Sequence, residues 1–320
     1  MLIFLIMKRI FCFVLAFFSF FLISAQSPSI RLGVLKGVSC APCAYLIENK
    51  AKLAVQNLSF KVFDSQRTEA ATLLRGEIDA GFINPSDAAK IFSKTEGALV
   101  ALGVSQNGNL FLVTGDSSYS SLADLKGRSV LCDENDSDGT KVFTHLFQKK
   151  FPAANDPQDS SEGSISIDLS VPKASIANSL ILQKSDFALL CEPFATVALS
   201  HSKNLRRAEN IQKIYSDLEE KSAFPAMLLV VRADFAKENR DLIRKFVEIY
   251  KAAVNWTNRN PVKAGFLAEK HKIFHSPAVI TNSIPNAAIV WRDAVTAKPD
   301  LEKFFEIIKI EPPAGEFYFR

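Results

Sequence analysis

The chain contains few of the residues from which common catalytic and metal centres are built. It has four histidines and five cysteines in 320 residues, and no G-x-S-x-G, Walker or H-E-x-x-H pattern. These absences exclude the sequence signatures of α/β-hydrolases, P-loop nucleotidases and zinc peptidases. The sequence therefore predicts a protein that is not an enzyme, with no catalytic residues, no cofactor and no bound metal ion.

An excess of basic residues is also missing. The chain has 38 Lys and Arg against 34 Asp and Glu, a formal charge of +4. Without residues 1–25, which contain Lys8 and Arg9, the charge is +2. Proteins that bind nucleic acids carry a concentrated basic surface, so this balance excludes nucleic acid as the expected partner.

Cysteine is too scarce for a disulfide-stabilised scaffold. Only Cys40, Cys43, Cys132 and Cys191 follow residue 25. Cys40 and Cys43 form a C-x-x-C at an expected helix start, but the flanking sequence is not that of a dithiol oxidoreductase. Three alternatives remain: a disulfide within a lobe, a zinc or copper(I) site of all four thiolates, or small packing residues.

Residues 1–25 form a typical export signal. Lys8 and Arg9 precede a long apolar run, which ends in the small residues Ser24 and Ala25. This pattern predicts a secretory signal peptide cleaved after Ala25 and a periplasmic location. An uncleaved anchor is the alternative. No cysteine follows the apolar run directly, so a lipoprotein anchor is not expected.

The mature chain opens with a strand, a turn and a helix in residues 31–48, RLGVLKGVSCAPCAYLIE. Residues 32–35 form the expected strand, and Pro42 suits the first turn of a helix because its missing N–H has no intrahelical partner there. Ser39 or Cys40 then lies at or just before the N-cap. Free backbone N–H groups at a helix start bind polar groups, which predicts a small-molecule contact at the carboxyl end of this strand.

The order of elements predicts an α/β protein. Short apolar strands over 58–63, 78–83, 98–104 and 110–113 alternate with helices, which favours parallel, doubly wound sheets. After a strand at 224–231 we expect only helices, over 242–258, 261–270, 278–283 and 294–308. The aromatic tail at 312–320 needs a surface on which to dock.

An internal repeat predicts two similar lobes. LLRGEIDAGFINP, residues 73–85, and LILQKSDFALLCEP, residues 180–193, share a helix end, a turn and an Asp before a buried strand. Asp79 and Asp186 begin these strands. Asn84-Pro85 and Glu192-Pro193 end them. A single three-layer domain is the alternative.

Seven segments in order resemble the periplasmic solute-binding proteins of ABC importers. The resemblance is strongest to the branch for nitrate, sulfonate, taurine and thiamine-precursor uptake, and it covers nearly the whole mature chain. The segments that carry it are GVLKGVSCAPCAYLIE, LLRGEIDAGFINPSDAA, SLADLKGRSV, DFALLCEPFATVAL, LLVVRADFAKENRDLIRKFVEIYKAAVNW, IPNAAIVW and EFYFR.

This resemblance implies a two-lobed fold of the type II periplasmic-binding-protein class, in which each lobe is a doubly wound sheet and the ligand cleft lies between them. Lobe 1 is expected over residues 26–114 and 224–320, and lobe 2 over 115–223. The implied function is capture of a small solute and its delivery to a membrane permease by a monomer. The alternatives are an enzyme on the same fold, such as a pyrimidine synthase of thiamine biosynthesis, and a receptor for soft metals.

The resemblance also implies which residues face the solute. The expected contacts are Gly37, Val38, Ser39, Cys40, Ala41, Asn84, Ser105, Asn107, Gly139, Thr140, Cys191, Glu192, Phe224 and Pro225. Two departures from the family pattern fall among them. Cysteines stand at 40 and 43, where related chains tend to carry Gly, Thr or Ser, and the loop DENDSDG at 133–139 replaces a glycine-rich turn.

Overall fold

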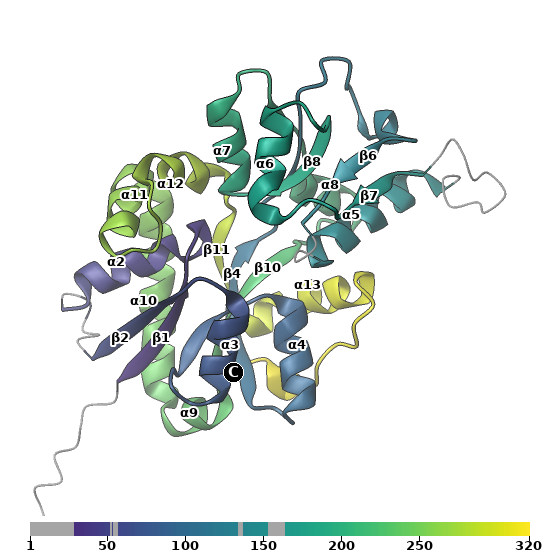
Figure 1. Cartoon of the computed structure of the whole chain (residues 1–320). Helices are drawn as coiled ribbons and strands as arrows, with labels where there is room; N and C mark the ends of the chain where they lie inside the picture. The colour runs from purple at the N-terminus through teal and green to yellow at the C-terminus, as the bar shows by residue number, and fades with distance from the viewer. Residues whose placement is uncertain (1–28, 52, 54–56, 134–136, 153–163) are drawn as a thin grey trace, which may run out of the picture.

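The computed structural model describes residues 29–51, 53, 57–133, 137–152 and 164–320, which form two α/β lobes (Figure 1). The expected signal peptide at 1–25 lies outside these ranges, as do residues 134–136 of the polar loop. Within the described ranges, no helix has the length and apolar character needed to cross a bilayer.

The first lobe is built on a six-stranded mixed sheet. Its strands, in spatial order, are β11 (Ile289–Asp293), β4 (Leu99–Asn107), β10 (Pro225–Arg232), β3 (Ala80–Ile83), β1 (Ile30–Leu35) and β2 (Leu58–Phe63). The helices of this lobe are α2 (Ala41–Asn49), α3 (Gln66–Leu74), α4 (Pro85–Lys94), α9 (Ala233–Glu238), α10 (Arg240–Arg259), α11 (Pro261–Lys270), α12 (Pro277–Ser283) and α13 (Ala294–Ile307). Short 3₁₀ turns are η1 (Val38–Cys40), η4 (Ile284–Asn286) and η5 (Gly315–Phe317).

The second lobe is built on a five-stranded mixed sheet. Its strands, in spatial order, are β7 (Ser166–Asp168), β6 (Ser129–Leu131), β8 (Phe187–Cys191), β5 (Leu110–Thr114) and β9 (Arg206–Asn210). Its helices are α5 (Ser137–Lys150), α6 (Lys173–Ile181), α7 (Phe194–His201) and α8 (Ile211–Leu218), with a 3₁₀ turn η2 (Leu122–Leu125).

Each sheet is parallel except where a strand arrives from the other lobe and, in the first sheet, at the edge strand β11. β1, β2 and β3 run parallel, and so do β6, β7 and β8. β10 returns from the second lobe and pairs antiparallel with β3 and β4, while β5 enters from the first lobe and pairs antiparallel with β8 and β9. A chain that crosses at the carboxyl ends of the parallel strands must enter the next sheet in the opposite direction. Both sheets therefore direct these carboxyl ends toward the junction of the lobes.

Three expectations about the strands were wrong. β5 belongs to the second sheet rather than to lobe 1, because it pairs with β8 and β9. The sheets are mixed rather than wholly parallel, because β10 and β5 pair antiparallel with their neighbours. The chain after residue 231 is not entirely helical, because β11 adds an edge strand antiparallel to β4.

The C-terminal tail docks on the first lobe. The Phe319 backbone N–H donates to the Ala101 carbonyl at 3.0 Å, and Tyr318 bridges to the same residue of β4. Phe317 is fully buried, with its ring edge-to-face with Phe92 of α4. Burial of two large rings stabilises this docking through the hydrophobic effect, as the aromatic composition of the tail predicts.

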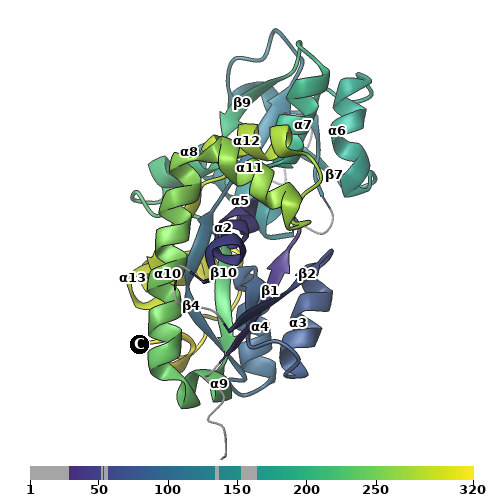
Figure 2. The same ribbon diagram turned by 90° about the vertical axis from the view of Figure 1, so that its left-hand side faces the viewer.

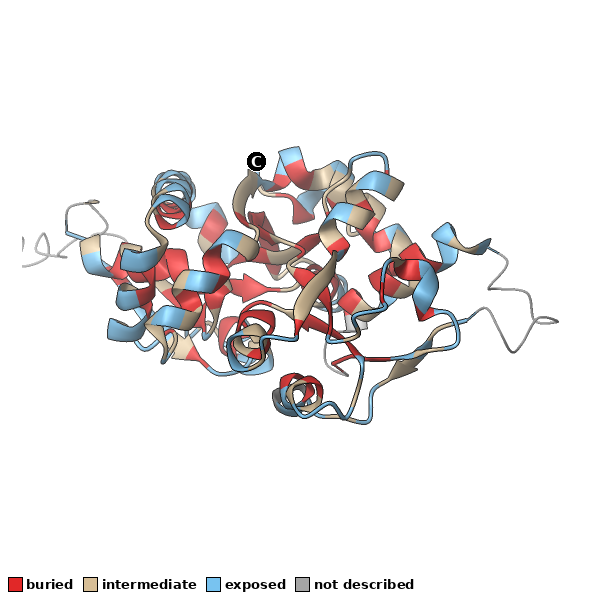
Figure 3. Cartoon of the chain, turned by 90° about the horizontal axis from the view of Figure 1, so that it is seen from above, coloured by how far each residue is buried: buried red, intermediate tan, exposed pale blue. Residues whose placement is uncertain are grey.

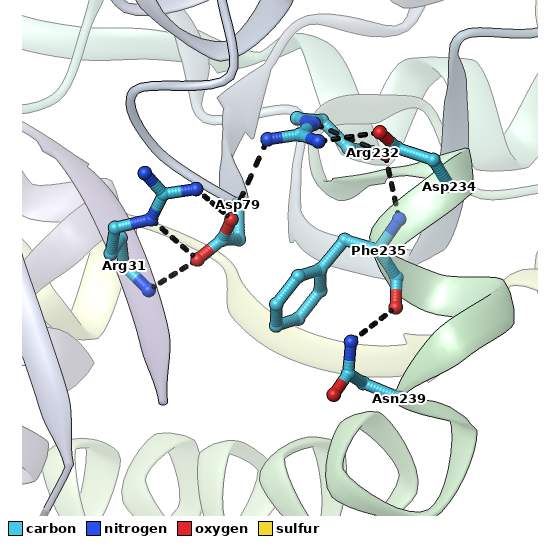
Figure 4. A network of polar contacts seen from close by, with 6 residues as sticks. All are labelled: Arg31, Asp79, Arg232, Asp234, Phe235 and Asn239. Carbon is cyan, nitrogen blue, oxygen red and sulfur yellow. Dashed lines mark hydrogen bonds and ion pairs between the residues drawn. The ribbon is translucent and has the colours of Figure 1, made fainter. Parts of the chain in front are cut away.

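Both lobes carry the same ion pair at the amino end of a central strand. Asp79, just before β3, accepts from the Arg31 guanidinium at 2.5 and 3.0 Å, and Arg232 lies 3.7 Å away (Figure 4). Asp186, just before β8, accepts from Arg128 at 2.8 Å. The repeat in the sequence is therefore a repeat in structure, and it places an Asp–Arg pair far from the carboxyl ends of the strands in each lobe.

The lobes also meet beside the crossovers. α12 of the first lobe lies next to α7 of the second (Figure 2), and α13 contacts α5. Buried residues concentrate along the central strands of both sheets and on the inward faces of the helices, as Figure 3 shows. The chain thus forms two packed lobes joined by two crossover segments, residues 108–110 and 219–225.

Candidate functional site

A cavity of about 160 Å³ lies where the two lobes and the two crossovers meet. Its lining consists of the start of α4 (84–87), the first crossover (108–110), Asp138 of α5 and the start of β10 (224–226). The first and last of these segments belong to the first lobe, while Leu110 and Asp138 belong to the second lobe. A molecule in this cavity therefore contacts both lobes at the carboxyl ends of their parallel strands, where open α/β sheets bind ligands.

Asn84 organises the first-lobe wall of the cavity. Its side-chain oxygen caps α4 by accepting from the Asp87 backbone N–H at 2.7 Å, and it also accepts from the Ser86 hydroxyl at 3.1 Å. Its Nδ2 donates to Asp87 Oδ2 at 3.1 Å. Pro85 occupies the first turn of the helix, where it removes no needed hydrogen bond. This small network holds an amide, a hydroxyl and a carboxylate in fixed positions at the cavity.

The two crossovers form the back of the cavity and are bonded to each other. The Gly108 backbone N–H donates to the Phe224 carbonyl at 2.7 Å. The Phe224 ring stacks on Phe304 of α13 with centroids 5.6 Å apart and lies 5.8 Å from Tyr215 of α8. The crossover that leads into β10 is thus anchored to a helix of each lobe.

Asp138 supplies the second-lobe wall. It lies in the first turn of α5, it is 9 % exposed, and both of its carboxylate oxygens are buried. A negative charge is favoured in the first turn of a helix, where the macrodipole is positive. The helix start therefore holds an ionisable acid at the junction of the lobes.

A family model described as NMT1/THI5 like matches residues 98–264, which is more than half of the chain. The chain belongs to the NMT1/THI5-like family. No curated protein matches it in sequence.

Solved structures show the same fold over most of the chain. An ABC transporter from Parabacteroides distasonis is 19 % identical, with a TM-score of 0.74 over 92 % of this chain and 99 % of that one. The periplasmic aliphatic sulphonate-binding protein SsuA from Escherichia coli is 16 % identical, with a TM-score of 0.67 over 92 % and 93 %. The periplasmic nitrate-binding protein NrtA from Synechocystis PCC 6803 is 14 % identical, with a TM-score of 0.58 over 88 % and 81 %. These structures confirm the expected two-lobed fold.

Three of the expected contact residues line the cavity of this NMT1/THI5-like protein: Asn84, Phe224 and Pro225. Asp87 and Asp138, which also line the cavity, were not among the expected contact residues. Two signals in the sequence pointed to them: Asp87 is the third residue after the N-cap in N-P-S-D, and Asp138 lies in the polar loop that departs from the family pattern. The contact of any of these residues with a solute stays a prediction.

The turn over Gly37–Ala41 is packed more tightly than expected. The Gly37 backbone N–H donates to the Ile273 carbonyl at 3.1 Å, and its φ of 139° suits glycine. Val38, Cys40 and Ala41 are buried, and Ser39 is partly exposed. Cys40 is the N-cap of α2 and makes no side-chain capping bond, although Pro42 lies in the first turn as predicted. None of these five residues lines the cavity.

The carboxylate of Glu192 is occupied within its own lobe. It forms a buried ion pair with Arg207 of β9, whose Nε donates to Oε1 at 3.1 Å, and it accepts from the Thr196 backbone N–H at 3.1 Å. At 3 % exposure it ties β8 to α7 and β9. The structure therefore gives the Glu192 carboxylate a structural role within the second lobe.

The remaining expected residues are divided between packing and the junction of the lobes. The Ser105 hydroxyl donates to the Met227 carbonyl at 3.3 Å inside the first sheet. Asn107 accepts from Arg292 at 3.0 Å. Gly139 and Thr140 lie in the first turns of α5, and Cys191 pairs with Leu110 across β8 and β5. None of these residues belongs to the lining of the cavity.

The cysteines form neither a disulfide nor a metal site in the described part of the chain. None of the four is in a disulfide, and no three His, Cys, Asp or Glu side chains among the described residues are placed to share an ion. Cys40 and Cys43 are fully buried in the first lobe, whereas Cys132 and Cys191 end strands of the second. Burial, with a further effect of the neighbouring Cys40, raises the pKa of the Cys43 thiol well above its usual range. A thiol that stays protonated is a poor metal ligand and nucleophile, so the burial of Cys43 disfavours the soft-metal alternative.

Proposed function

We propose that this chain is the solute-binding component of an ABC-type import system. It holds a small solute between its lobes, delivers it to a membrane permease and performs no chemistry on it. The cavity at the crossovers carries this proposal, because its lining comes from both lobes. A ligand that contacts both lobes favours the arrangement in which they are closed, and hinge closure of this kind is a recurrent way to couple binding to recognition.

The comparisons support this function at the level of the fold. The similar structures include an ABC transporter and sulphonate- and nitrate-binding proteins. We further propose that the protein is an exported monomer and that its hinge lies at the two crossovers. The lobes then comprise residues 26–109 with 224–320, and residues 110–223, since β5 belongs to the second sheet.

A thermal-shift screen of the purified protein tests the proposal. The panel contains nitrate, sulfonates, taurine, thiamine precursors, amino acids and small amines. A ligand at a hundred times its dissociation constant adds about 2.7 kcal/mol to the free energy of unfolding, which corresponds to several degrees in a chain of this size. We expect one chemical class to raise the melting temperature.

Two variants test whether the rise in melting temperature comes from binding in the cavity. Ala226→Trp places an indole in the cavity and should abolish the shift, while Ala123→Trp, on the exposed surface of η2, should retain it. The bound compound is then recovered by denaturation and identified by mass spectrometry. An unchanged mass supports a receptor, whereas conversion of the compound would contradict the proposal and favour an enzyme.

A further inference from the structure

The ionisable side chains among the described residues of the cavity lining are all acidic. Asp87 approaches from the first lobe and Asp138 from the second, and these described residues include no Lys, Arg or His. Two carboxylates on opposite walls of a cavity create a negative potential within it. Such a potential favours a cation and opposes an anion.

The hydrogen-bond donors of the lining are largely used within the protein. Pro85 and Pro225 have no N–H, and the backbone N–H groups of Gly108 and Asp87 donate to Phe224 and Asn84. The Ser86 hydroxyl donates to Asn84. The Asn84 amide donates one N–H to Asp87, and the Asn109 amide donates one N–H to the Glu192 carbonyl. The donors used in this way are not available to an anion, whereas the ionised carboxylates of Asp87 and Asp138 can only accept. This observation does not depend on the number of charges, and it also favours a guest that donates hydrogen bonds.

Two basic residues near the ends of the strands are paired with acids outside the cavity, and a third, Lys90, is paired with Asp87 of the lining. Lys36 forms an ion pair with Asp64 at 2.5 Å, and Arg207 is held by Glu192. Lys90 lies 3.6 Å from Asp87 on the outer part of α4, with 47 % of its side chain exposed. The starts of α4 and α5 each carry a carboxylate in the first turn, which already complements the positive end of the helix. The carboxylate in each first turn therefore opposes an anionic group at these helix starts.

We infer that the solute carries a compact positive charge with N–H donors, such as a primary ammonium or an amidinium group, and is not a sulfonate or nitrate. This inference rests on the proposed function, since it assigns the class of solute to the same cavity. The ammonium donates to the Asp87 and Asp138 carboxylates, one from each lobe, so that one charge links the two walls. Charge-assisted hydrogen bonds of this kind are the stronger ones in proteins. The volume of about 160 Å³ is below the ~300–1,000 Å³ of pockets for drug-sized ligands, so the solute is small.

Matched pairs of compounds test this inference by calorimetry on the full-length protein. Ethanolamine and isethionate share a hydroxyethyl group and differ in carrying an ammonium or a sulfonate, and propylamine and propanesulfonate form a second pair. We expect the amines to bind and the sulfonates not to. Asp138→Asn keeps the shape of the side chain and removes its charge, and should weaken amine binding by about tenfold to a hundredfold.

A control variant separates local charge from overall charge. Asp241 lies in the first turn of α10 and is almost fully exposed, so Asp241→Asn makes the same change outside the cavity and should leave amine binding unaltered. Binding of isethionate in preference to ethanolamine would overturn the inference and leave the proposed receptor function intact. Equal amine affinities in the wild type and Asp138→Asn would also overturn it. If no class of solute binds, both proposals fail.

Discussion

At the scale of single residues, Glu69 is the most unusual side chain of the first lobe. It is fully buried between α3 and the sheet, where one oxygen accepts from the Phe82 backbone N–H at 2.9 Å. A Cβ on Gly33 or Gly81 would lie 2.5 and 2.8 Å from that oxygen, so both strands need glycine beneath the carboxyl group. Burial raises the pKa of Glu69 to about 8. The folded protein therefore holds this residue as a neutral acid at neutral pH.

This raised pKa predicts a stability that falls with pH. Between the ordinary value of 4.5 and about 8, Glu69 is protonated in the folded chain and ionised in the unfolded chain, so unfolding releases a proton and becomes easier as the pH rises. Glu69→Gln removes this titration and retains an oxygen for Phe82. We expect the variant to gain about 2–4 kcal/mol relative to the wild type between pH 5 and pH 8, as measured by urea unfolding.

Glu238→Gln serves as the control for that comparison, because Glu238 is exposed at the end of α9. Its pH profile should follow the wild type. Parallel profiles for Glu69→Gln and the wild type would show that Glu69 is ionised in the folded protein.

At the scale of elements, the crossovers depend on a close approach of two backbones. A Cβ on Gly108 would overlap the ring of Phe224, which is itself held between Tyr215 and Phe304. Gly108→Ala should therefore lower the free energy of unfolding by about 1–3 kcal/mol, the usual cost of overpacking. Gly315→Ala, where a Cβ meets nothing within 4 Å, should change it by less than about 0.5 kcal/mol. Equal stabilities of the two variants, measured by denaturant titration, would refute this account of the crossover.

At the scale of the whole molecule, Glu219 connects the lobes. It is buried after α8 and accepts from His145 and Lys149 of α5, each at 2.8 Å, while Lys303 of α13 lies 3.5 Å away. Burial acts to raise the pKa of Glu219, but the hydrogen bonds from Lys149 and His145 outweigh it and lower that pKa. One carboxylate therefore holds two helices of the second lobe and one of the first.

Replacement of Glu219 should affect stability more than replacement of its partner across the lobes. Glu219→Gln leaves the basic groups without their carboxylate and should cost about 2–3 kcal/mol at pH 7, whereas Lys303→Ala removes a half-exposed pair and should cost less than about 1 kcal/mol. Because the pKa is lowered in the folded chain, this stabilisation is present above pH 4.5 and is lost at lower pH. The gap between the wild type and Glu219→Gln in thermal unfolding should therefore narrow in acid. A gap that widens in acid would argue against this role.

The candidate site was only partly predictable. The Asn84-Pro85 dipeptide marked the end of the third strand, and the structure adds that Asn84 caps α4. Asp138 was not predicted as a cavity residue, because the cavity is formed by helices and crossovers that are distant from one another in the chain. Glu192 occupies the matching position in the repeat, yet its carboxylate is taken by Arg207, a residue of β9.

The polar strand β9 is an element that the sequence pattern did not predict. RRAEN has no apolar pattern, and it forms a strand because it lies at the edge of the second sheet, beside β5. Edge strands tolerate charged residues since one side meets solvent.

Local sequence by itself determined the α/β class and the repeat of two lobes. It also determined the start of α2 at the Pro42 turn and the need of the aromatic tail for a docking surface. Each of these features follows from neighbouring residues or from composition. Only the tertiary structure decided that β5 joins the second sheet, that β10 runs antiparallel and that two acids face one cavity. These features depend on partners far apart in the chain, whose pairing is settled by packing and by the direction in which each crossover enters its sheet.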